Sequence, residues 1–454
     1  MKITVADFLF CVALVIFPML AVAQVAPPKA DWTMLVYVNG KNSLESAAIT
    51  DFYEMAEVGS SPRVQVIAQV GRPKQHYSTV EGGWSGVYRF RVVKGMKPRP
   101  ANAVVDLQKE GLNTDMANPD TLEDFVRWGT RTYPAKKTML VIWNHGQGFR
   151  FLLDPDPKNR IIAAKQIRSA TEMQVFTGLR GPAVTSGHRA VSSDDDSKGI
   201  LYNRQIQDTL EKLSKQGIPL DVIGFDACLM SMVETAYALR KIADYMVASE
   251  ELEPGNGWNY RTILRKLNIK PEMDASELAQ EIVSAYENQY QDGDRTTLST
   301  LNLKKVDDFA KSLSDLSNYL LQNISVQKKY ISAARSDVRS FGDWDQPPMQ
   351  TSIDLKLFLS KLKDNNPDKI AVQKIDNTLS LLKNVVVNNY RSAPVSDDGY
   401  GGNGLAIYFP ESKKIFKDDR FGDGYLPTNT IHPLEFVTSP QTSGWSRLVL
   451  KMLE

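Results

Sequence analysis

Several short apolar runs, separated by stretches of helical periodicity, constrain the fold of this chain more than any other feature. The runs lie at 32–38, 64–70, 138–143, 220–225 and 245–249, with an alternating, half-exposed run at 86–93. Strands that are buried on both faces have this near-continuous apolar character, which is typical of parallel sheets. The intervening periodicity predicts helices at 43–57, 122–132 (capped by Thr121), 203–216 and 229–242. We therefore predict an α/β fold with a mostly parallel sheet flanked by helices.

The second half of the chain has a different pattern. It predicts helices at 275–290, 304–321, 355–362 and 372–387, followed by one more strand at 404–410. We therefore expect a first unit over 31–270 and a largely helical C-terminal region over 271–454 that returns a single strand.

Composition excludes several classes of function. The 54 Lys and Arg residues against 53 Asp and Glu give a net charge of +1, so the chain lacks the basic field of a nucleic-acid-binding protein. Its 2 cysteines and 4 histidines are too few for a disulfide framework or a cysteine-rich zinc module. The HExxH and GxSxG motifs of zinc peptidases and serine hydrolases are also absent from the sequence.

The N-terminus has the pattern of a secretory signal peptide. Lys2 is followed by an apolar run over 8–23 that ends in the small-x-small sequence Ala21-Val22-Ala23. The run is shorter than the about 20 residues of a membrane span, although an anchored N-terminus remains the alternative. We expect removal of residues 1–23, no membrane span afterwards, and a secreted, periplasmic or cell-surface protein.

Two reactive side chains follow two of the predicted strands. His145 comes after the run at 138–143, and Cys228 comes after 220–225, where it would open the helix at 229–242. A helix N-terminus favours a thiolate, and a neighbouring imidazole would favour it further and could protonate a leaving amine. The backbone N–H groups of Gly146 and Cys228 could bind an oxyanion. The alternatives are a buried core cysteine and a loop histidine.

Acidic residues near Cys228 bear on the substrate. Asp226 would either bind a cationic substrate side chain or cap the helix that begins at Leu229. Glu250, Glu251 and Glu253 would either line the same cleft or form a solvated turn.

Five segments of this sequence together identify a relationship: WTMLVYVNGKNSLE (32–45), VIWNHGQGF (141–149), IGFDACLMSMVETAYAL (223–239), ASEELEPGNGW (248–258) and GLAIYFP (404–410). In this order they resemble the clostripain family of cysteine peptidases, within the wider group of caspases, gingipains and legumains. The resemblance implies a caspase-like catalytic domain, a dyad of His145 and Cys228, and cleavage after Arg or Lys. It also implies that Asp226 lies in the pocket for the substrate's P1 residue.

The resemblance further implies a zymogen that is cut between the dyad residues. That position falls on 150–198, a long aperiodic segment rich in the basic residues that the proposed pocket accepts. Arg168 and Arg180 are followed by small residues and are the preferred sites. We expect a monomer or a self-cleaved two-chain form whose partners are protein or peptide substrates with Arg or Lys at P1.

No cofactor is expected, with calcium as an open alternative. Some family members depend on calcium, but the first turn reads NGKNSLE where the family often has GDN, and strand 64–70 continues into Gly71-Arg72. Asp194-Asp195-Asp196 would supply oxygen ligands for calcium or form a solvated loop. Two other functions stay open: a catalytically silent binding or adhesion protein, and a cysteine peptidase with a non-basic P1 preference.

Overall fold

A central nine-stranded sheet organises the computed structural model of this chain, which describes all residues except 1–28, 147–191, 291–293, 343–350, 420–421 and 429–432. The strand order is β12-β10-β9-β8-β5-β1-β2-β3-β4. The strands are β1 (Ala30–Asn39), β2 (Val64–Arg72), β3 (Gly86–Arg91), β4 (Val105–Asp106), β5 (Ala135–Trp143), β8 (Leu220–Asp226), β9 (Ala243–Ala248), β10 (Thr297–Asn302) and β12 (Val386–Arg391).

The middle of this sheet is parallel, as predicted. Strands β9, β8, β5, β1 and β2 run in one direction, and the strands at both edges are antiparallel to their neighbours. Consecutive side chains of β1 enter opposite cores: Leu35 and Tyr37 pack on one face, and Met34 and Val36 on the other. Both faces of β1 are therefore buried, which explains its unbroken apolar run.

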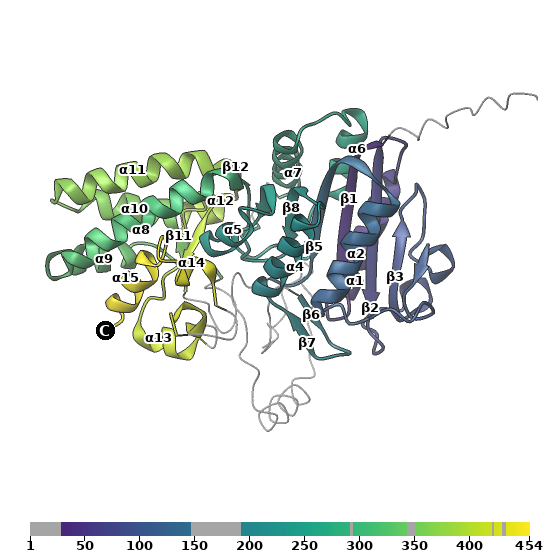
Figure 1. The fold of residues 1–454 in the computed structure, drawn as a ribbon, viewed down its shortest axis with the longest axis horizontal. Helices are drawn as coiled ribbons and strands as arrows, with labels where there is room; N and C mark the ends of the chain where they lie inside the picture. The colour runs from purple at the N-terminus through teal and green to yellow at the C-terminus, as the bar shows by residue number, and fades with distance from the viewer. Residues whose placement is uncertain (1–28, 147–191, 291–293, 343–350, 420–421, 429–432) are drawn as a thin grey trace, which may run out of the picture.

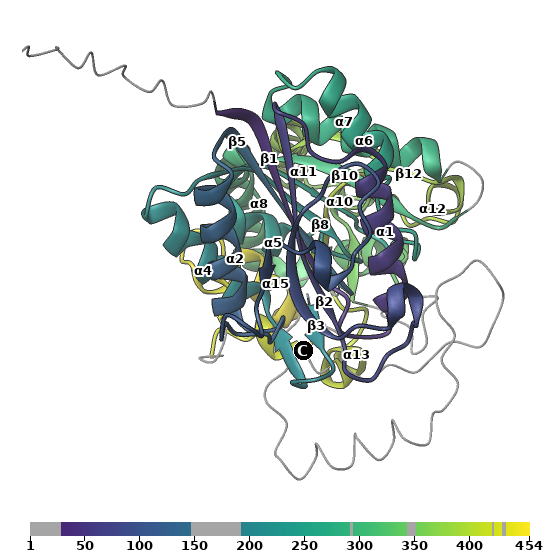
Figure 2. The same cartoon turned by 90° about the vertical axis from the view of Figure 1, so that its right-hand side faces the viewer.

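Helices cover both faces of the sheet. Figure 2 shows α2 and α4 on one side and α1, α6 and α7 on the other. Their bounds are α1 (Glu45–Val58), α2 (Pro119–Thr132), α4 (Asn203–Lys215), α5 (Val233–Leu239), α6 (Tyr260–Ile269) and α7 (Ala275–Gln289). The predicted cap of α2 was wrong by three residues, because Asn118 rather than Thr121 accepts the first backbone N–H.

The C-terminal helices pack beyond the β12 edge of the sheet (Figure 1). They are α8 (Val306–Gln322), α9 (Ile324–Ser336), α10 (Leu355–Asp364), α11 (Lys369–Val385), α12 (Ala393–Asp397), α13 (Lys413–Asp418), α14 (Glu435–Thr438) and α15 (Gly444–Met452). The strand predicted at 404–410 is β13 (Ala406–Tyr408), which pairs with β11 (Ser352–Asp354). Strands β10 and β12 also come from this half of the chain, and they extend the central sheet. The division into two units at residue 270 stays a prediction.

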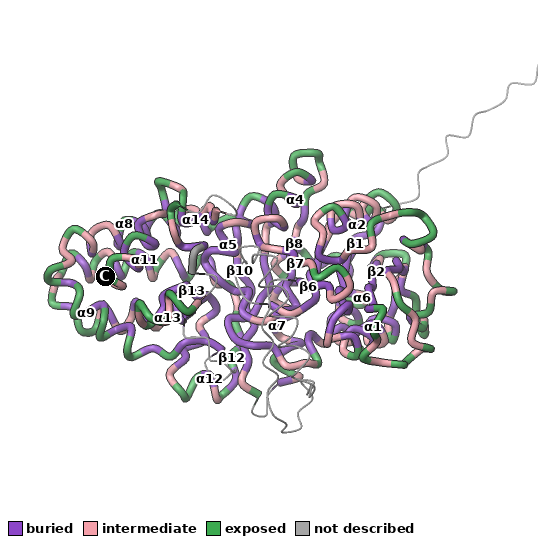
Figure 3. Tube along the Cα trace, turned by 90° about the horizontal axis from the view of Figure 1, so that it is seen from below, coloured by how far each residue is buried: buried purple, intermediate pink, exposed green. Residues whose placement is uncertain are grey.

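A hairpin of β6 (Ser192–Asp194) and β7 (Gly199–Leu201) begins where the description resumes after residue 191. Seen in Figure 3, the buried part of the chain follows the sheet, and exposed chain gathers at the periphery. The predicted signal peptide lies outside the described residues. Within the residues described, no helix combines the length and apolar character needed to cross a bilayer.

Candidate active site

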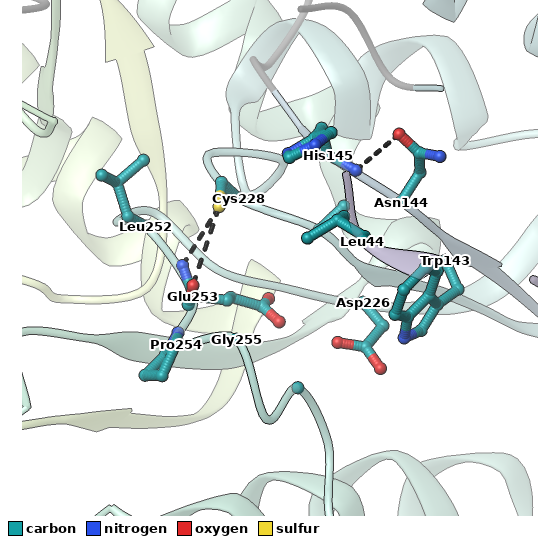
Figure 4. A pocket seen from close by; sticks show the side chains of 12 residues that line it. Leu44, Trp143, Asn144, His145, Asp226, Cys228, Leu252, Glu253, Pro254 and Gly255 are labelled. Carbon is teal, nitrogen blue, oxygen red and sulfur yellow. Dashed lines mark hydrogen bonds between the residues drawn. The ribbon is translucent and has the colours of Figure 1, made fainter. Parts of the chain in front are cut away.

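The carboxyl ends of β5 and β8 bring the two predicted reactive residues together. These strands are parallel neighbours, and the register places Trp143 opposite Asp226. His145 and Cys228 each follow two residues later, and both line one pocket (Figure 4). Asp226 and Glu253 line the same pocket. Ligands of parallel sheets bind at this edge, so the pocket is the candidate active site.

Cys228 lies in a tight turn instead of at a helix end. The predicted helix start at Leu229 was wrong, because Leu229 has a φ of 61° and α5 begins only at Val233. The residues between them pair with another segment: the Leu229 N–H donates to the Glu251 carbonyl at 3.1 Å. The expected helix dipole at the thiol is therefore absent among these described residues.

A backbone N–H reaches the thiol instead. The Glu253 N–H donates to Cys228 Sγ at 3.3 Å. This hydrogen bond to sulfur favours the thiolate, as the helix N-terminus was expected to do, whereas the hydrogen bond that the thiol donates to the Glu253 carbonyl at 3.9 Å favours the thiol.

His145 is held through its backbone and through its ring. Its N–H donates to Asn144 Oδ1 at 2.6 Å, and the Asn144 amide donates to the Asn39 carbonyl at 2.6 Å. Its Nε2 lies 3.1 Å from Ser43 Oγ. Sequence reasoning missed Ser43, although it follows the first strand, whose neighbour in the sheet is β5.

Gly146 packs against the backbone of Cys228. A Cβ atom at position 146 would lie 2.1 Å from the Cys228 carbonyl oxygen and 2.7 Å from its nitrogen. Only glycine permits this approach, which brings the chain after the histidine onto the turn of the cysteine. The contribution of both N–H groups to an oxyanion hole stays a prediction.

Asp226 forms a buried wall of the pocket. Its carboxylate accepts hydrogen bonds from the Tyr260 hydroxyl at 2.8 Å and the Trp258 N–H at 3.3 Å. Burial raises the pKa of Asp226 to about 6, although the Tyr260 hydrogen bond opposes the shift. The alternative of a helix cap was wrong, because α5 begins seven residues later.

The three glutamates after β9 are buried, so the alternative of a solvated turn was wrong. Only Glu253 lines the pocket. Burial and the nearby charge of Asp226 raise the pKa of Glu253 well above its ordinary range. A protonated Glu253 beside an ionised Asp226 gives the pocket one negative charge and one neutral carboxyl group. Glu250 and Glu251 instead accept hydrogen bonds from the Gly404 and Gly342 N–H groups, respectively.

Lysine occupies the region where calcium was considered. Lys41 Nζ lies 2.9 Å from Asp194 Oδ2 and 3.3 Å from Asp196 Oδ2, and it donates to the Thr114 carbonyl at 3.0 Å. Asp195 accepts a hydrogen bond from the Tyr77 hydroxyl. Within the described ranges, no three His, Cys, Asp or Glu side chains are grouped to hold a metal ion. A calcium requirement stays a prediction.

Most of the segment proposed for cleavage lies outside the described residues, including Arg168 and Arg180. Its described end, 192–198, starts the β6–β7 hairpin. Ser192 Oγ and the Ser193 carbonyl accept hydrogen bonds from Asn39 Nδ2 at 2.7 and 2.8 Å. The hairpin is thereby tied to the turn that follows β1.

Comparisons with known proteins find several that are similar to this chain. A profile of the clostripain family matches residues 36–176 and 180–432. Clostripain of Hathewaya histolytica is 23% identical over 456 residues, covering 88% of this chain and 77% of that protein. An inactive zymogen of a C11 protease from Parabacteroides distasonis matches with a TM-score of 0.56 and 18% identity, covering 85% of this chain and 94% of that one. A secreted C11 cysteine protease from Bacteroides thetaiotaomicron, solved with an irreversible peptide inhibitor, matches with a TM-score of 0.56 and 17% identity, covering 92% and 99%.

Proposed function

The chain belongs to the clostripain family of cysteine peptidases, and from that premise we propose that it is an exported endopeptidase that cleaves after Arg or Lys. In this proposal, Cys228 is the nucleophile and His145 exchanges the proton. The observation that carries the proposal is the convergence of His145, Cys228 and Asp226 on one pocket from two register-matched strand ends.

The proposed reaction begins with proton transfer from the Cys228 thiol to the His145 ring. The thiolate attacks the scissile carbonyl carbon, and the backbone N–H groups of Gly146 and Cys228 stabilise the negative charge on its oxygen. The imidazolium returns the proton to the leaving amine as the C–N bond breaks. Water then attacks the thioester, giving the carboxylate product and the free thiol.

Selectivity for a basic P1 residue is assigned to Asp226. Its carboxylate is buried within the pocket, where water screens a charge poorly. A guanidinium can donate two parallel hydrogen bonds to a carboxylate, so Arg should be preferred to Lys. The fixed negative charge also disfavours an acidic P1 residue.

Export and self-activation complete the proposal. Export is supported by the sequence pattern of residues 1–23 and by the secreted relative from Bacteroides thetaiotaomicron. Activation by cleavage is supported by the zymogen from Parabacteroides distasonis and by the basic, aperiodic sequence between the two dyad residues. The cut is proposed after Arg168 or Arg180.

Two variants test the dyad. Cys228→Ala and His145→Ala should each lower the hydrolysis of a peptidyl-arginine substrate by orders of magnitude, because nucleophile and base act as a unit. Ser46→Ala, at an exposed position on α1, is the control. A folded Cys228→Ala protein that hydrolyses the substrate at the wild-type rate would refute the assignment.

An affinity label separates this proposal from a silent binding protein. An irreversible peptidyl-arginine inhibitor should label the wild type at Cys228 and should protect that thiol from iodoacetamide. A matched peptidyl-leucine inhibitor should label it far more slowly. Equal labelling by both would support a peptidase with a non-basic P1 preference, and labelling by neither would support a silent protein.

A further inference from the structure

The turn after β1 places a hydroxyl group on the ring of the proposed catalytic histidine. Ser43 Oγ lies 3.1 Å from His145 Nε2. We infer that Ser43 is the positioning residue of His145: it holds Nε2, so that the ring exchanges its proton with Cys228 through Nδ1. This inference rests on the proposed function, since it concerns how the proposed dyad is aligned.

The sheet explains why Ser43 reaches the histidine. Strand β1 is the parallel neighbour of β5, and Val38 lies opposite Trp143 in their register. Ser43 follows β1 in the short connection to α1, and His145 follows β5 at the same edge of the sheet. The dyad and its positioning residue thus come from three adjacent strands, β1, β5 and β8.

The connection that carries Ser43 is firmly held. Asn42 Oδ1 accepts the Leu44 N–H at 2.9 Å, and Asn42 Nδ2 donates to the Ser193 carbonyl at 3.0 Å. Lys41 is 4% exposed and binds Asp194 through its ammonium. Both neighbours of Ser43 on its N-terminal side are therefore anchored, so its hydroxyl is presented from a fixed backbone.

The same anchors also hold the histidine backbone. Asn144 Oδ1 accepts N–H groups from both His145 and Ser193, at 2.6 and 3.3 Å. One hydrogen-bond network therefore holds both the ring and the backbone of His145, and this network includes the first strand of the β6–β7 hairpin. A shift of the Ser43 backbone relative to the His145 backbone would therefore strain these hydrogen bonds.

A hydroxyl group suits both protonation states of the ring. When His145 is an imidazolium, its Nε2–H can donate to Ser43 Oγ. When the neutral ring is ready to accept the thiol proton at Nδ1, its proton lies on Nε2, which donates to the same Ser43 oxygen. Ser43 can therefore keep the ring in one orientation through the reaction cycle without adding a charge. Loss of the hydroxyl should leave substrate binding intact and misalign proton transfer.

A shape-matched pair of variants isolates the hydroxyl. Ser43→Thr retains the hydroxyl group, and Ser43→Val has nearly the same shape as Ser43→Thr without the hydroxyl. We expect Ser43→Thr to keep most of the wild-type kcat, and Ser43→Val and Ser43→Ala to lose about 10- to 100-fold in kcat with little change in KM. Ser46→Ala, an exposed serine on α1, is the matched control and should behave like the wild type.

The pH dependence of thiol alkylation provides a readout that needs no substrate. In the wild type, the rate with iodoacetamide should rise at the low pH where the imidazolium–thiolate pair forms. In Ser43→Val this rise should move toward the pH of an ordinary thiol, and in Ser43→Thr it should stay. A merely structural role would lower the melting temperature without moving this profile.

The outcomes separate the two proposals. If Cys228→Ala is inactive while Ser43→Val keeps the wild-type kcat and alkylation profile, the positioning role is overturned and the proposed function stands. If the wild type hydrolyses no peptide, the proposed function fails, and the alkylation profiles still decide the role of Ser43. If Ser43→Ala does not fold, the comparison of Ser43→Thr with Ser43→Val decides it.

Discussion

Trp143 lies directly opposite Asp226 in the parallel ladder between β5 and β8. Both strands end at this pair, and on each chain the reactive side chain follows two residues later, so His145 and Cys228 come at matching positions beyond the sheet edge. The register of two central strands therefore determines where the proposed dyad lies. The P1 carboxylate belongs to the same ladder, so nucleophile and specificity group are fixed by one pairing.

Substitution of Gly146 should lower the activity although both members of the dyad keep their side chains. In Gly146→Ala, the new Cβ would lie 2.1 Å from the Cys228 carbonyl oxygen, so one of the two backbones must move. We expect a loss of about 100-fold or more in kcat/KM, since small displacements of reacting groups have effects of this size. Steady-state kinetics on the purified variant measure it.

Gly111→Ala is the control for that experiment. Gly111 has a φ of 68°, and a Cβ there would meet nothing within 4 Å. The control should lose about 1–2 kcal/mol of stability from backbone strain and keep its activity. Wild-type activity in Gly146→Ala would contradict the contact between position 146 and the cysteine turn.

Asp226→Asn should weaken the preference for a basic P1 residue. The substitution keeps the shape of the side chain and removes its charge, so the substrate cation would be buried without a partner. Such a loss typically costs 2–5 kcal/mol, which is about 30- to 5000-fold in kcat/KM for Arg substrates. A peptide library cleaved by wild type and variant measures the effect. Equal cleavage after Arg and Leu by the wild type would contradict the assignment.

The free energy of unfolding of the protein without substrate should depend on pH through the titration of buried Asp226. Burial raises the pKa of Asp226 in the folded state to about 6, against 3.8 for the ordinary group. The folded state therefore keeps a proton that the unfolded state releases between these two pKa values. The contribution of Asp226 to the free energy of unfolding is fully present below pH 3.8 and is lost as the pH rises through about 6.

Denaturation of wild type and Asp226→Asn at several pH values tests this linkage. Relative to the variant, the wild type should lose unfolding free energy on the order of 3 kcal/mol between about pH 4 and pH 7. The difference between the two proteins cancels the titration of groups that do not interact with Asp226. A difference that does not change with pH would show that Asp226 titrates normally.

Continuous apolar runs were sufficient to predict the parallel centre of the sheet, because strands such as β1 are buried on both faces. The edge strands were harder to predict from the sequence. The sequence of β10, Thr297–Asn302, is apolar only at its two leucines, and its Thr and Ser hydroxyls are buried through tertiary hydrogen bonds such as that from Thr300 to the Ala279 carbonyl. Strand β12 follows α11 without a break, and its register was fixed only by β10.

The reactive side chains could be predicted from their positions after the strands, but the contacts that these side chains make could not. The periodicity after Cys228 favoured an immediate helix, yet the backbone there pairs with residues 249–251 and leaves Leu229 at positive φ. Ser43 reaches His145 only because β1 lies beside β5, which is a property of strand order. Such long-range pairing has no local sequence signal.

Chelation of divalent cations should leave the activity unchanged. Lys41 already places a positive charge between Asp194 and Asp196, so these carboxylates have little reason to bind calcium. Assays with EDTA and with added calcium should agree. A chelator-sensitive wild type would show that a cation binds elsewhere.

Removal of the Lys41 ammonium should allow Asp194 and Asp196 to bind calcium. In Lys41→Met, the buried carboxylate of Asp194 keeps its backbone hydrogen bonds but loses the Lys41 ammonium, and a broken buried ion pair typically costs about 3–5 kcal/mol. The melting temperature should fall, and calcium should raise it in this variant but not in the wild type. Lys94→Met, at an exposed position, is the control, and its melting temperature should stay at the wild-type value with and without calcium.

Cleavage after Arg168 or Arg180 should give two chains that stay together. The cut would separate β5 from β8, which pair over 139–143 and 222–226 in the middle of the sheet. Separation of the pieces would open the core that both share, so purified wild type should give two bands in a denaturing gel and one species in native sizing. The Cys228→Ala protein should remain one band, and N-terminal sequencing of the larger wild-type fragment should begin within 151–199. Equal processing of the inactive variant in the absence of other proteases would refute self-activation, because the thiol would then not be needed for the cut.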